Sequence, residues 1–387
     1  MTNEQTPAPA APKKSARIES IDGLKGLSAV WVLVFHYLLA FAPFGAIGFG
    51  FGLTTNEQKY NVYFDNFPFS VFTNTPFVLY VFFALIAFIP ALRFWQKGDG
   101  DFLAKQMVTR YFRLMPATLA SALLGFLGFW LFRDIHLQYN EVVGNPWMKS
   151  LFYDNLSFGG AVYAGVYDSL IHGDSTYGSV LWCMQTVLVG SYLTYAVLLM
   201  FGKLRNRWLI YLPLLALSFL APIYTAFLGG IAAADYSVNA AKEKKHELLA
   251  LFLVLLGFVI GNFPRVMYAG WADKGTFLGI GVFVFLLGFV RSSLMNMLFS
   301  CRFMKHLGTI SFGIILVHFP VLLYFSTWMY MQLDAAGVAY AWNVVLTTLA
   351  ALPIVYVMSL IFYYAVEVPG GKLCNLIFKP FDPRAVK

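Results

Sequence analysis

A lysine and a histidine in the first apolar segment have residue types and a spacing that suit chemistry inside a membrane. Ten residues separate Lys25 from His36. Eleven helical steps of about 100° return to within about 20° of the starting direction, so both side chains share one helix face, roughly 16 Å apart. An imidazole is a base near neutral pH, and a cation on the same face attracts an anionic donor. The alternative is that His36 hydrogen-bonds a neighbouring helix and Lys25 extends to the membrane surface.

Two arginines form a second candidate group. Arg110 and Arg113 are three residues apart, so on a helix they share a face and can bind phosphates in bidentate fashion. The alternative is that they anchor the cytoplasmic start of a span, with Pro116 in its first turn. A second histidine, His318, lies in the stretch 307–320. It is either another site residue or a hydrogen-bonding residue of helix packing.

The composition places these residues in a membrane protein. Hydrophobic residues make up 59% of the 387 residues and charged residues only 12%, whereas soluble globular proteins are about 45 to 50% apolar and about 25% charged. These values exclude a soluble domain, a disulfide scaffold, a disordered chain and a collagen. We therefore predict an all-α fold, a polytopic membrane helical bundle embedded in the lipid bilayer.

The net charge of +8 comes from short basic clusters between apolar runs. Such clusters mark the cytoplasmic side of a membrane protein, so we expect no nucleic-acid partner. The cysteines Cys183, Cys301 and Cys374 show no CxxC spacing. Neither a disulfide framework nor a metal site is predicted.

Nine apolar stretches have the length of membrane spans. They cover residues 24–46, 76–95, 114–132, 180–201, 208–231, 248–263, 277–290, 310–331 and 344–366. The basic clusters place both termini in the cytoplasm, which requires an even number of crossings. We predict about 10 transmembrane helices, with one span missed or one long segment split between Trp208 and His306.

The remaining segments complete the predicted organisation. Residues 1–16 are polar and rich in Pro and Ala, which predicts a disordered cytoplasmic tail, and residues 371–387 are predicted as a second cytoplasmic tail. The transmembrane domain covers residues 17–370. Residues 134–179 carry aromatic residues among polar ones, which predicts interfacial helices on the outer face.

Several of these motifs together resemble a known family. The stretch from Asp22 through Lys25 to His36 resembles the first-helix signature of the acyltransferase-3 family of integral membrane O-acyltransferases. The RxxR motif of that family is matched by Arg110 and Arg113. Its FF, GxxSYxxYLxH and ExP motifs are similar to Phe82-Phe83, to residues 307–320 and to Glu367-Val-Pro369. The order and spacing agree from about residue 17 to 370.

The resemblance implies an activity. Members move an acyl group, usually acetyl from acetyl-CoA, from the cytoplasm onto a hydroxyl of an exported polysaccharide or similar glycan. It implies that His36 is catalytic and that Lys25, Arg110 and Arg113 contact the acyl-CoA donor. Substrate-binding or supporting positions would be His318, Asp22, Trp182 and Gln185. The implied location is a bacterial inner membrane, and the transfer requires a cavity lined by His36.

The chain also departs from the family pattern. Ile86 and Ala87 replace a Ser-Gly pair, and Val187 replaces a glutamate that follows Trp182 in the family. Lys25 replaces the commoner arginine, which keeps the cation and loses bidentate geometry. These departures leave open a second reading, in which the chain is a non-catalytic relative that serves as a transporter or scaffold with an export-machinery partner.

Overall fold

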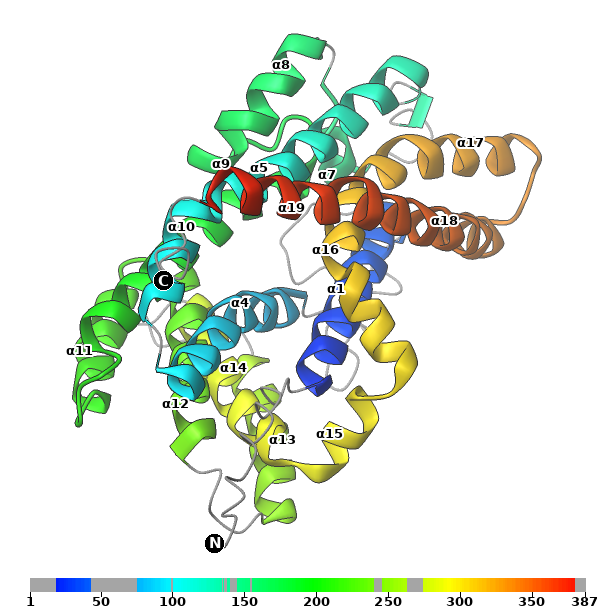
Figure 1. Ribbon diagram of the computed structural model, residues 1–387. Helices are drawn as coiled ribbons and strands as arrows, with labels where there is room; N and C mark the ends of the chain where they lie inside the picture. The colour runs from blue at the N-terminus through cyan, green and yellow to red at the C-terminus, as the bar shows by residue number, and fades with distance from the viewer. Residues whose placement is uncertain are drawn as a thin grey trace, which may run out of the picture.

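The computed structural model describes residues 19–42, 75–98, 100–133, 135, 138–139, 145–153, 155–239, 246–262 and 274–379. Within these ranges the chain is all-helical, without a strand (Figure 1). The longer α-helices are α1 (Glu19–Phe41), α4 (Thr75–Lys97), α5 (Gly100–Leu131), α10 (Cys183–Phe201), α11 (Trp208–Ser218), α12 (Thr225–Asn239), α13 (Glu247–Gly261), α14 (Lys274–Arg291), α16 (Arg302–Pro320), α18 (Tyr340–Phe362) and α19 (Val368–Ile377).

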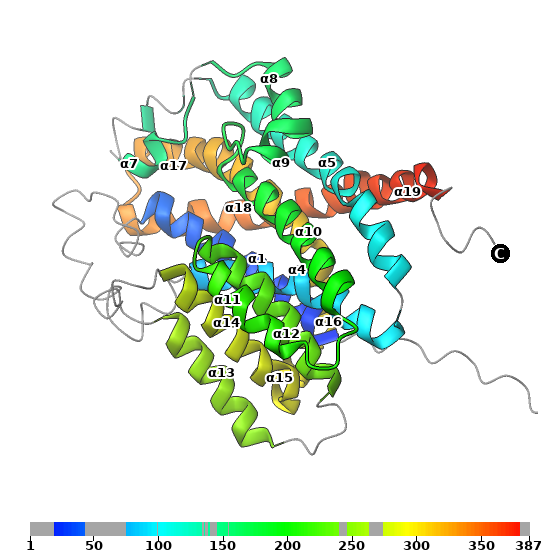
Figure 2. The same ribbon diagram turned by 90° about the vertical axis from the view of Figure 1, so that its left-hand side faces the viewer.

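Shorter elements connect the long helices. The short α-helices are α7 (Pro146–Lys149), α8 (Phe158–Tyr163), α9 (Ser169–Ile171), α15 (Ser293–Phe299) and α17 (Thr327–Ala335). The 3₁₀ segments are η3 (Ser179–Trp182) and η4 (Pro222–Tyr224), and the π segments are η2 (Ala164–Asp168), η7 (Val321–Ser326) and η8 (Tyr363–Glu367). The short helices predicted between residues 134 and 179 are therefore present, gathered at one end of the bundle in both views (Figures 1 and 2). Their placement on the outer face stays a prediction.

Six helices in the described part of the chain are long and apolar enough to cross a membrane. They cover Glu19–Phe41, Thr75–Lys97, Gly100–Leu131, Ser179–Phe201, Arg302–Ala335 and Tyr340–Ile377. A seventh span arises if α14 and α15, which meet at an angle of 88°, are counted together. The all-helical membrane architecture is thus confirmed, and the total of about ten helices stays a prediction.

The stretch 208–231, predicted as one span, is divided into two helices, which is a split within the range Trp208 to His306 where one was predicted. α11 ends at Ser218, and α12 begins only at Thr225. Pro222 lies between the two helices, and a proline disfavours the helical conformation at the preceding residue. Ala221 accordingly has φ −145° and ψ 79°. At eleven residues, α11 is roughly 16 Å long, about half the thickness of a bilayer core.

The predicted tails fall only partly within the described residues. Residues 1–16 and 380–387 lie outside them. Residues 371–377 belong to α19 rather than to a separate tail, because the helix that begins at Val368 continues to Ile377.

Helix α1 packs closely against α16 near the middle of the molecule (Figure 1). Small residues permit the approach: a Cβ atom on Gly308 would collide with the backbone oxygen of Asp22, and one on Gly26 would collide with the backbone of Gly308. Gly23 meets the backbone of Phe299 in the same way. Small residues at such contacts let two membrane helices gain van der Waals packing along their backbones.

Replacing Gly308 by alanine should lower stability by about 1 to 3 kcal/mol, because the added methyl group meets a backbone atom that cannot rotate away. The measurement is the melting temperature of the purified chain in detergent. Gly371→Ala is the matched control, since its Cβ would meet nothing within 4 Å. Equal melting temperatures for the two variants would contradict the close contact between α1 and α16.

Candidate functional site

Two histidines meet where α1 packs against α16. The distance from Nε2 of His318 to Nδ1 of His36 is 3.1 Å, and the ring centroids are 5.1 Å apart. His318 is fully buried and His36 is half-buried. The sequence marked each residue separately, and the structure brings them together. His36 does hydrogen-bond a neighbouring helix, as the structural alternative held, but its partner is the other candidate histidine.

The hydrogen bonds assign the protons of this histidine pair. Nδ1 of His318 lies 2.9 Å from the carbonyl oxygen of Ile314, which can only accept, so this nitrogen carries a proton. In the neutral ring Nε2 of His318 is then an acceptor, and Nδ1–H of His36 donates to it. A backbone hydrogen bond to Val32 also involves the His36 ring. Nε2 of His36 consequently keeps its lone pair and is the basic atom of the pair.

Aromatic rings fix the plane of the His36 imidazole. Trp147, from α7, stacks on it with an interplanar angle of 13° and centroids 6.0 Å apart. Phe319 meets the imidazole edge-on at 5.4 Å and also contacts Trp147 at 6.1 Å. The sequence analysis did not select Trp147. Its only signal was an aromatic residue inside a polar loop.

The C-terminal end of α1 is tied down by side chains from distant segments. Nδ2 of Asn145 donates to the carbonyl oxygens of Leu39 and Ala40, each at 2.9 Å, and Oδ1 accepts from the backbone N–H of Trp147 at 3.0 Å. The hydroxyl of Tyr139 also donates to Ala40, at 2.6 Å. The last carbonyls of a helix have no partner within the helix. Here they are bound by the segment that places Trp147 over His36.

Helix α16 is anchored and interrupted beside His318. The hydroxyl of Ser121, from α5, donates to the carbonyl oxygen of Leu316 at 2.8 Å, two residues before the histidine. The π segment η7 begins at Val321, directly after Pro320. Proline removes a backbone donor from a helix, and π segments are frequent at functional sites. The irregular turn therefore adjoins the histidine pair.

Lys25 lies near two carboxylates. Its Nζ atom is 2.9 Å from Oδ1 of Asp22, one turn earlier in α1. Glu367, at the end of η8, interacts electrostatically with Lys25. Oε1 of Glu367 is buried and has no hydrogen-bond partner among the described residues. The sequence analysis noted Glu367 only as part of a motif, because nothing in the spacing shows that it interacts with Lys25.

The two arginines of α5 differ in their surroundings. Nε of Arg110 donates to Ser191 of α10 at 2.9 Å, so this side chain points between α5 and α10. Arg113 is exposed, and its Nη1 donates to Gln106 at 3.3 Å. The structure thus leaves Arg113 open at the surface and holds Arg110 against a neighbouring helix.

Trp182 and Gln185 make their described contacts away from the histidine pair. Trp182 meets Phe83 edge-on at 6.4 Å, and Nε2 of Gln185 donates to the carbonyl oxygen of Ile171 at 2.8 Å. Val187 is buried. The structure therefore gives Trp182 and Gln185 packing and capping contacts, and their proposed part in substrate binding stays a prediction.

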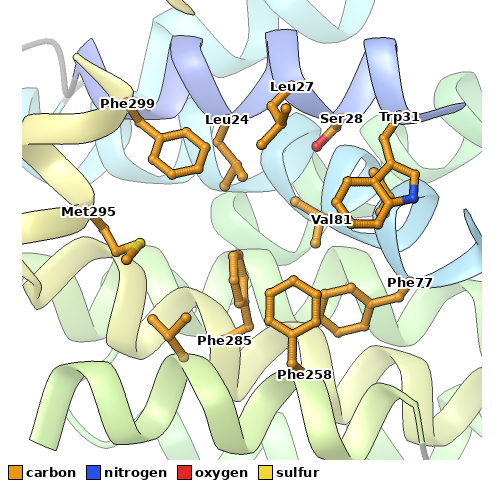
Figure 3. Close-up of a pocket in the computed structure, with 12 residues that line it drawn as sticks. Leu24, Leu27, Ser28, Trp31, Phe77, Val81, Phe258, Phe285, Met295 and Phe299 are labelled. Atoms are coloured by element: carbon orange, nitrogen blue, oxygen red, sulfur yellow. The ribbon is translucent and has the colours of Figure 1, made fainter. Parts of the chain in front are cut away.

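An apolar cavity of about 200 Å³ lies on another face of α1 (Figure 3). Leu24, Leu27, Ser28 and Trp31 line it, together with residues of α4, α13, α14 and α15. His36 lies five residues beyond Trp31, a rotation of about 140° around the helix. Neither this cavity nor a second one between α10, α11 and α12 includes His36, so the predicted cavity at the histidine pair stays a prediction. The described residues also contain no cluster of three or more His, Cys, Asp or Glu that could hold a metal ion.

The fold and the site define an all-helical membrane protein with a histidine pair between two closely packed helices. The family model described as an acyltransferase domain matches residues 18–364. The chain therefore belongs to the acyltransferase-3 family. This membership supports the general function of a membrane acyltransferase. Neither a curated protein nor a solved structure matches the chain.

Asn145→Ala should lower stability by about 2 to 3 kcal/mol, because two buried carbonyls of α1 and the N-terminus of α7 lose a partner. Trp147 should also lose its fixed position over His36. The check is a melting curve, together with protease cleavage within the segment 145–153. Asn155→Ala, at an exposed position shortly after that segment, should change stability by less than about 0.5 kcal/mol. Similar melting curves for both variants would show that Asn145 does not hold the end of α1.

Proposed function

We propose that the chain is a membrane O-acyltransferase. It transfers an acyl group from cytoplasmic acyl-CoA to a hydroxyl of an exported polysaccharide or similar glycan. The acyl group is proposed to be acetyl, because acetyl-CoA is the usual donor of the family. The observation that carries this proposal is the histidine pair, in which His318 directs the Nδ1 proton of His36 and leaves Nε2 free to act as a base.

The proposed reaction uses that lone pair directly. Nε2 of His36 takes the proton of the acceptor hydroxyl while the hydroxyl oxygen bonds to the thioester carbonyl carbon. The carbon–sulfur bond then breaks, and the CoA thiolate takes the proton back from the imidazolium. A positioned base of this kind typically contributes about 10² to 10⁴ in rate. His318 is a positioning residue, since its contact is with His36 rather than with the reacting atoms.

The donor is proposed to bind at the end of α1 that carries Lys25. Lys25 keeps 24% of its side chain exposed and is held by Asp22. A thioester whose phosphates contact Lys25 and Arg113 must reach roughly 16 Å along α1 to meet His36. The extended pantetheine arm of CoA suits that distance. No metal ion has a part in this scheme.

The proposed topology keeps ten crossings and both termini in the cytoplasm of a bacterial inner membrane. The six long helices and the bent pair of α14 and α15 account for up to seven of these crossings, and the others are proposed to lie between Trp208 and Gly261. The chain departs from the family pattern at Ile86, Ala87 and Val187. The alternative to test is therefore an inactive relative that serves as a transporter or scaffold for export.

His36→Ala should abolish acyl transfer while the chain still folds and binds CoA. His318→Phe should lower kcat by up to about tenfold with little change in KM, since one hydrogen bond is worth about 0.5 to 1.5 kcal/mol. His318→Gln should recover part of that loss, because the amide oxygen can accept from Nδ1 of His36. The measurement is transfer from labelled acetyl-CoA in membrane vesicles at matched expression.

Lys25→Arg should retain activity, which makes it the control for substitutions on α1. Near wild-type transfer by His36→Ala would refute the mechanism. A wild-type chain that neither transfers an acetyl group to any acceptor nor exchanges acetyl-CoA would favour the inactive relative.

Replacing Arg110 and Arg113 together by alanine should weaken CoA binding at least about tenfold, because charge-assisted hydrogen bonds are each worth about 1.5 to 3 kcal/mol. Of the two single variants, Arg113→Ala should cause the larger loss, since Arg110 already donates to Ser191. The measurement is isothermal titration calorimetry with CoA.

Arg93→Ala is the matched control, because Arg93 packs over the Phe102 ring at 3.9 Å and belongs to the same basic region of the sequence. It should bind CoA within about twofold of wild type. An unchanged affinity in the double variant would make both arginines topology anchors.

A further inference from the structure

A second apolar cavity, of about 250 Å³, lies between α10, α11 and α12. Its walls include Leu193 and Val197 from α10, Leu214 and Leu217 from α11, and Leu228 from α12. Leu193 is 46% exposed and Leu217 is 61% exposed, so the cavity reaches the surface of the bundle. α10 belongs to one of the candidate membrane spans, so the opening faces the lipid.

The lining of the cavity is almost entirely apolar. Two of its three hydroxyl residues are bonded to their own helices: Thr194 donates to the carbonyl oxygen of Gly190 at 2.7 Å, and Ser218 donates to that of Leu215 at 2.7 Å. Tyr224 packs its ring near Phe227, with centroids 5.9 Å apart. By volume the space would hold about eight waters, but a buried water needs two to four polar partners. Hydrocarbon is therefore the suitable occupant.

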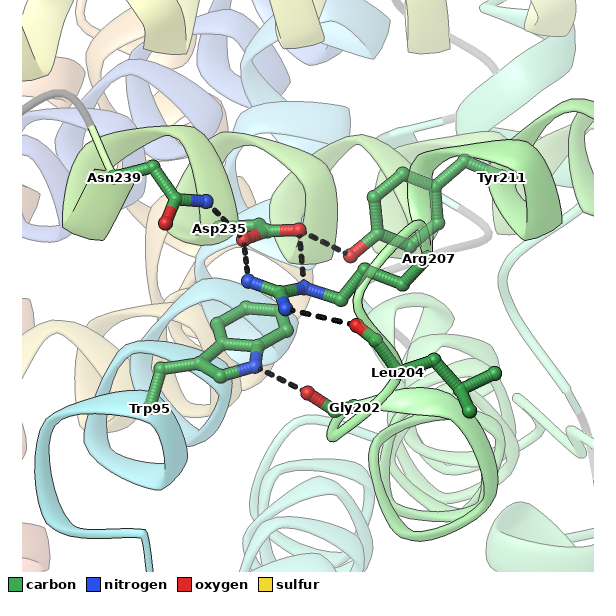
Figure 4. A network of polar contacts seen from close by, with 7 residues as sticks. All are labelled: Trp95, Gly202, Leu204, Arg207, Tyr211, Asp235 and Asn239. Atoms are coloured by element: carbon green, nitrogen blue, oxygen red, sulfur yellow. Dashed lines mark hydrogen bonds and ion pairs between the residues drawn. The ribbon is translucent and has the colours of Figure 1, made fainter.

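Helix α11 forms an outer wall of this cavity and is fixed at one end. It contains no buried residue and lies at the edge of the bundle (Figure 1). Its beginning is held by Asp235 of α12, which forms an ion pair with Arg207 and accepts from Tyr211 at 2.8 Å (Figure 4). The Arg207 guanidinium also lies 4.9 Å from the centre of the Trp95 ring. The network holds α11 in place and leaves the cavity beside it unfilled.

Two exposed cations lie just before α11. Lys203 and Arg205 are on the surface, whereas the three nitrogens of Arg207 are bonded to Asp235 and to the carbonyl oxygen of Leu204. Along α11, Leu214 lies roughly 10 Å and Leu217 roughly 15 Å beyond Arg207. One leaflet of a bilayer core is about 15 Å thick. A lipid whose phosphate contacts the two cations would thus reach the cavity with its acyl chain.

We propose that this cavity binds one acyl chain of an anionic phospholipid, whose headgroup phosphate pairs with Lys203 and Arg205. The chain fills the space that α11 leaves between itself and α10, and the lipid completes the packing of the broken segment 208–224. The site is separate from the histidine pair and does not depend on the proposed acyl transfer.

The test uses the full chain, purified in detergent and mixed with equal amounts of phosphatidylglycerol and phosphatidylcholine that carry the same acyl chains. Native mass spectrometry then measures the bound lipid. The wild type should retain one phosphatidylglycerol in at least about fivefold preference. Lys203→Ala combined with Arg205→Ala should remove the preference. Leu214→Trp, which fills the cavity, should lower the bound fraction of both lipids at least about tenfold.

Leu212→Trp is the matched control, since Leu212 lies on the same helix, is 59% exposed and does not line the cavity. It should bind lipid as the wild type does. A melting curve verifies that each variant is folded, and Val197→Trp fills the cavity from α10 if Leu214→Trp does not fold. Equal retention of the two lipids by the wild type, or equal binding by Leu214→Trp and Leu212→Trp, would overturn the proposal.

Discussion

The close approach of α1 and α16 is the constraint on which the candidate site depends. A hydrogen bond between imidazoles of two helices requires backbones near enough for both rings to meet, and the glycines at 26 and 308 remove the side chains that would keep the helices apart. The contact begins one turn from Lys25 and continues to His36 and His318. Packing that membrane helices use for stability thus also sets the distance between the two histidines of the candidate site.

Once the two helices are close, the free-energy cost of leaving a buried polar group without a hydrogen bond determines how the side chains around them are arranged. A buried imidazole nitrogen or backbone carbonyl without a partner costs free energy in a low-dielectric interior. His318 is satisfied by the Ile314 carbonyl and by His36, and the last carbonyls of α1 are satisfied by Asn145 and Tyr139. The same rule makes the unpaired Oε1 of Glu367 an exception. Glu367 interacts electrostatically with Lys25.

The sequence predicted what depends on local periodicity and composition. The all-helical membrane class, most of the apolar segments and the shared helix of Lys25 and His36 follow from hydropathy and the 3.6-residue repeat. Contacts between distant segments did not follow. No spacing within one helix shows that His318 reaches His36, or that Trp147 covers it from a short helix after a polar loop. A split segment between Trp208 and His306 was predicted, but its position near Pro222 was not, because the apolar run continues on both sides of it and hydropathy does not detect a change of direction.

The valine at position 187 changes the charge near Arg110, compared with the glutamate of the family pattern. Its carbonyl accepts from the hydroxyl of Ser191 at 2.6 Å, and the same hydroxyl accepts from Arg110 at 2.9 Å. Positions 187 and 191 are one turn apart on α10, so a glutamate at 187, as the family pattern has it, would stand one turn from the hydroxyl that Arg110 contacts. A carboxylate there could offset the arginine charge. Valine supplies no such charge, so in this chain position 187 does not offset the charge of Arg110. The departure therefore alters the electrostatics beside the RxxR arginines and leaves the histidine pair, on α1 and α16, intact.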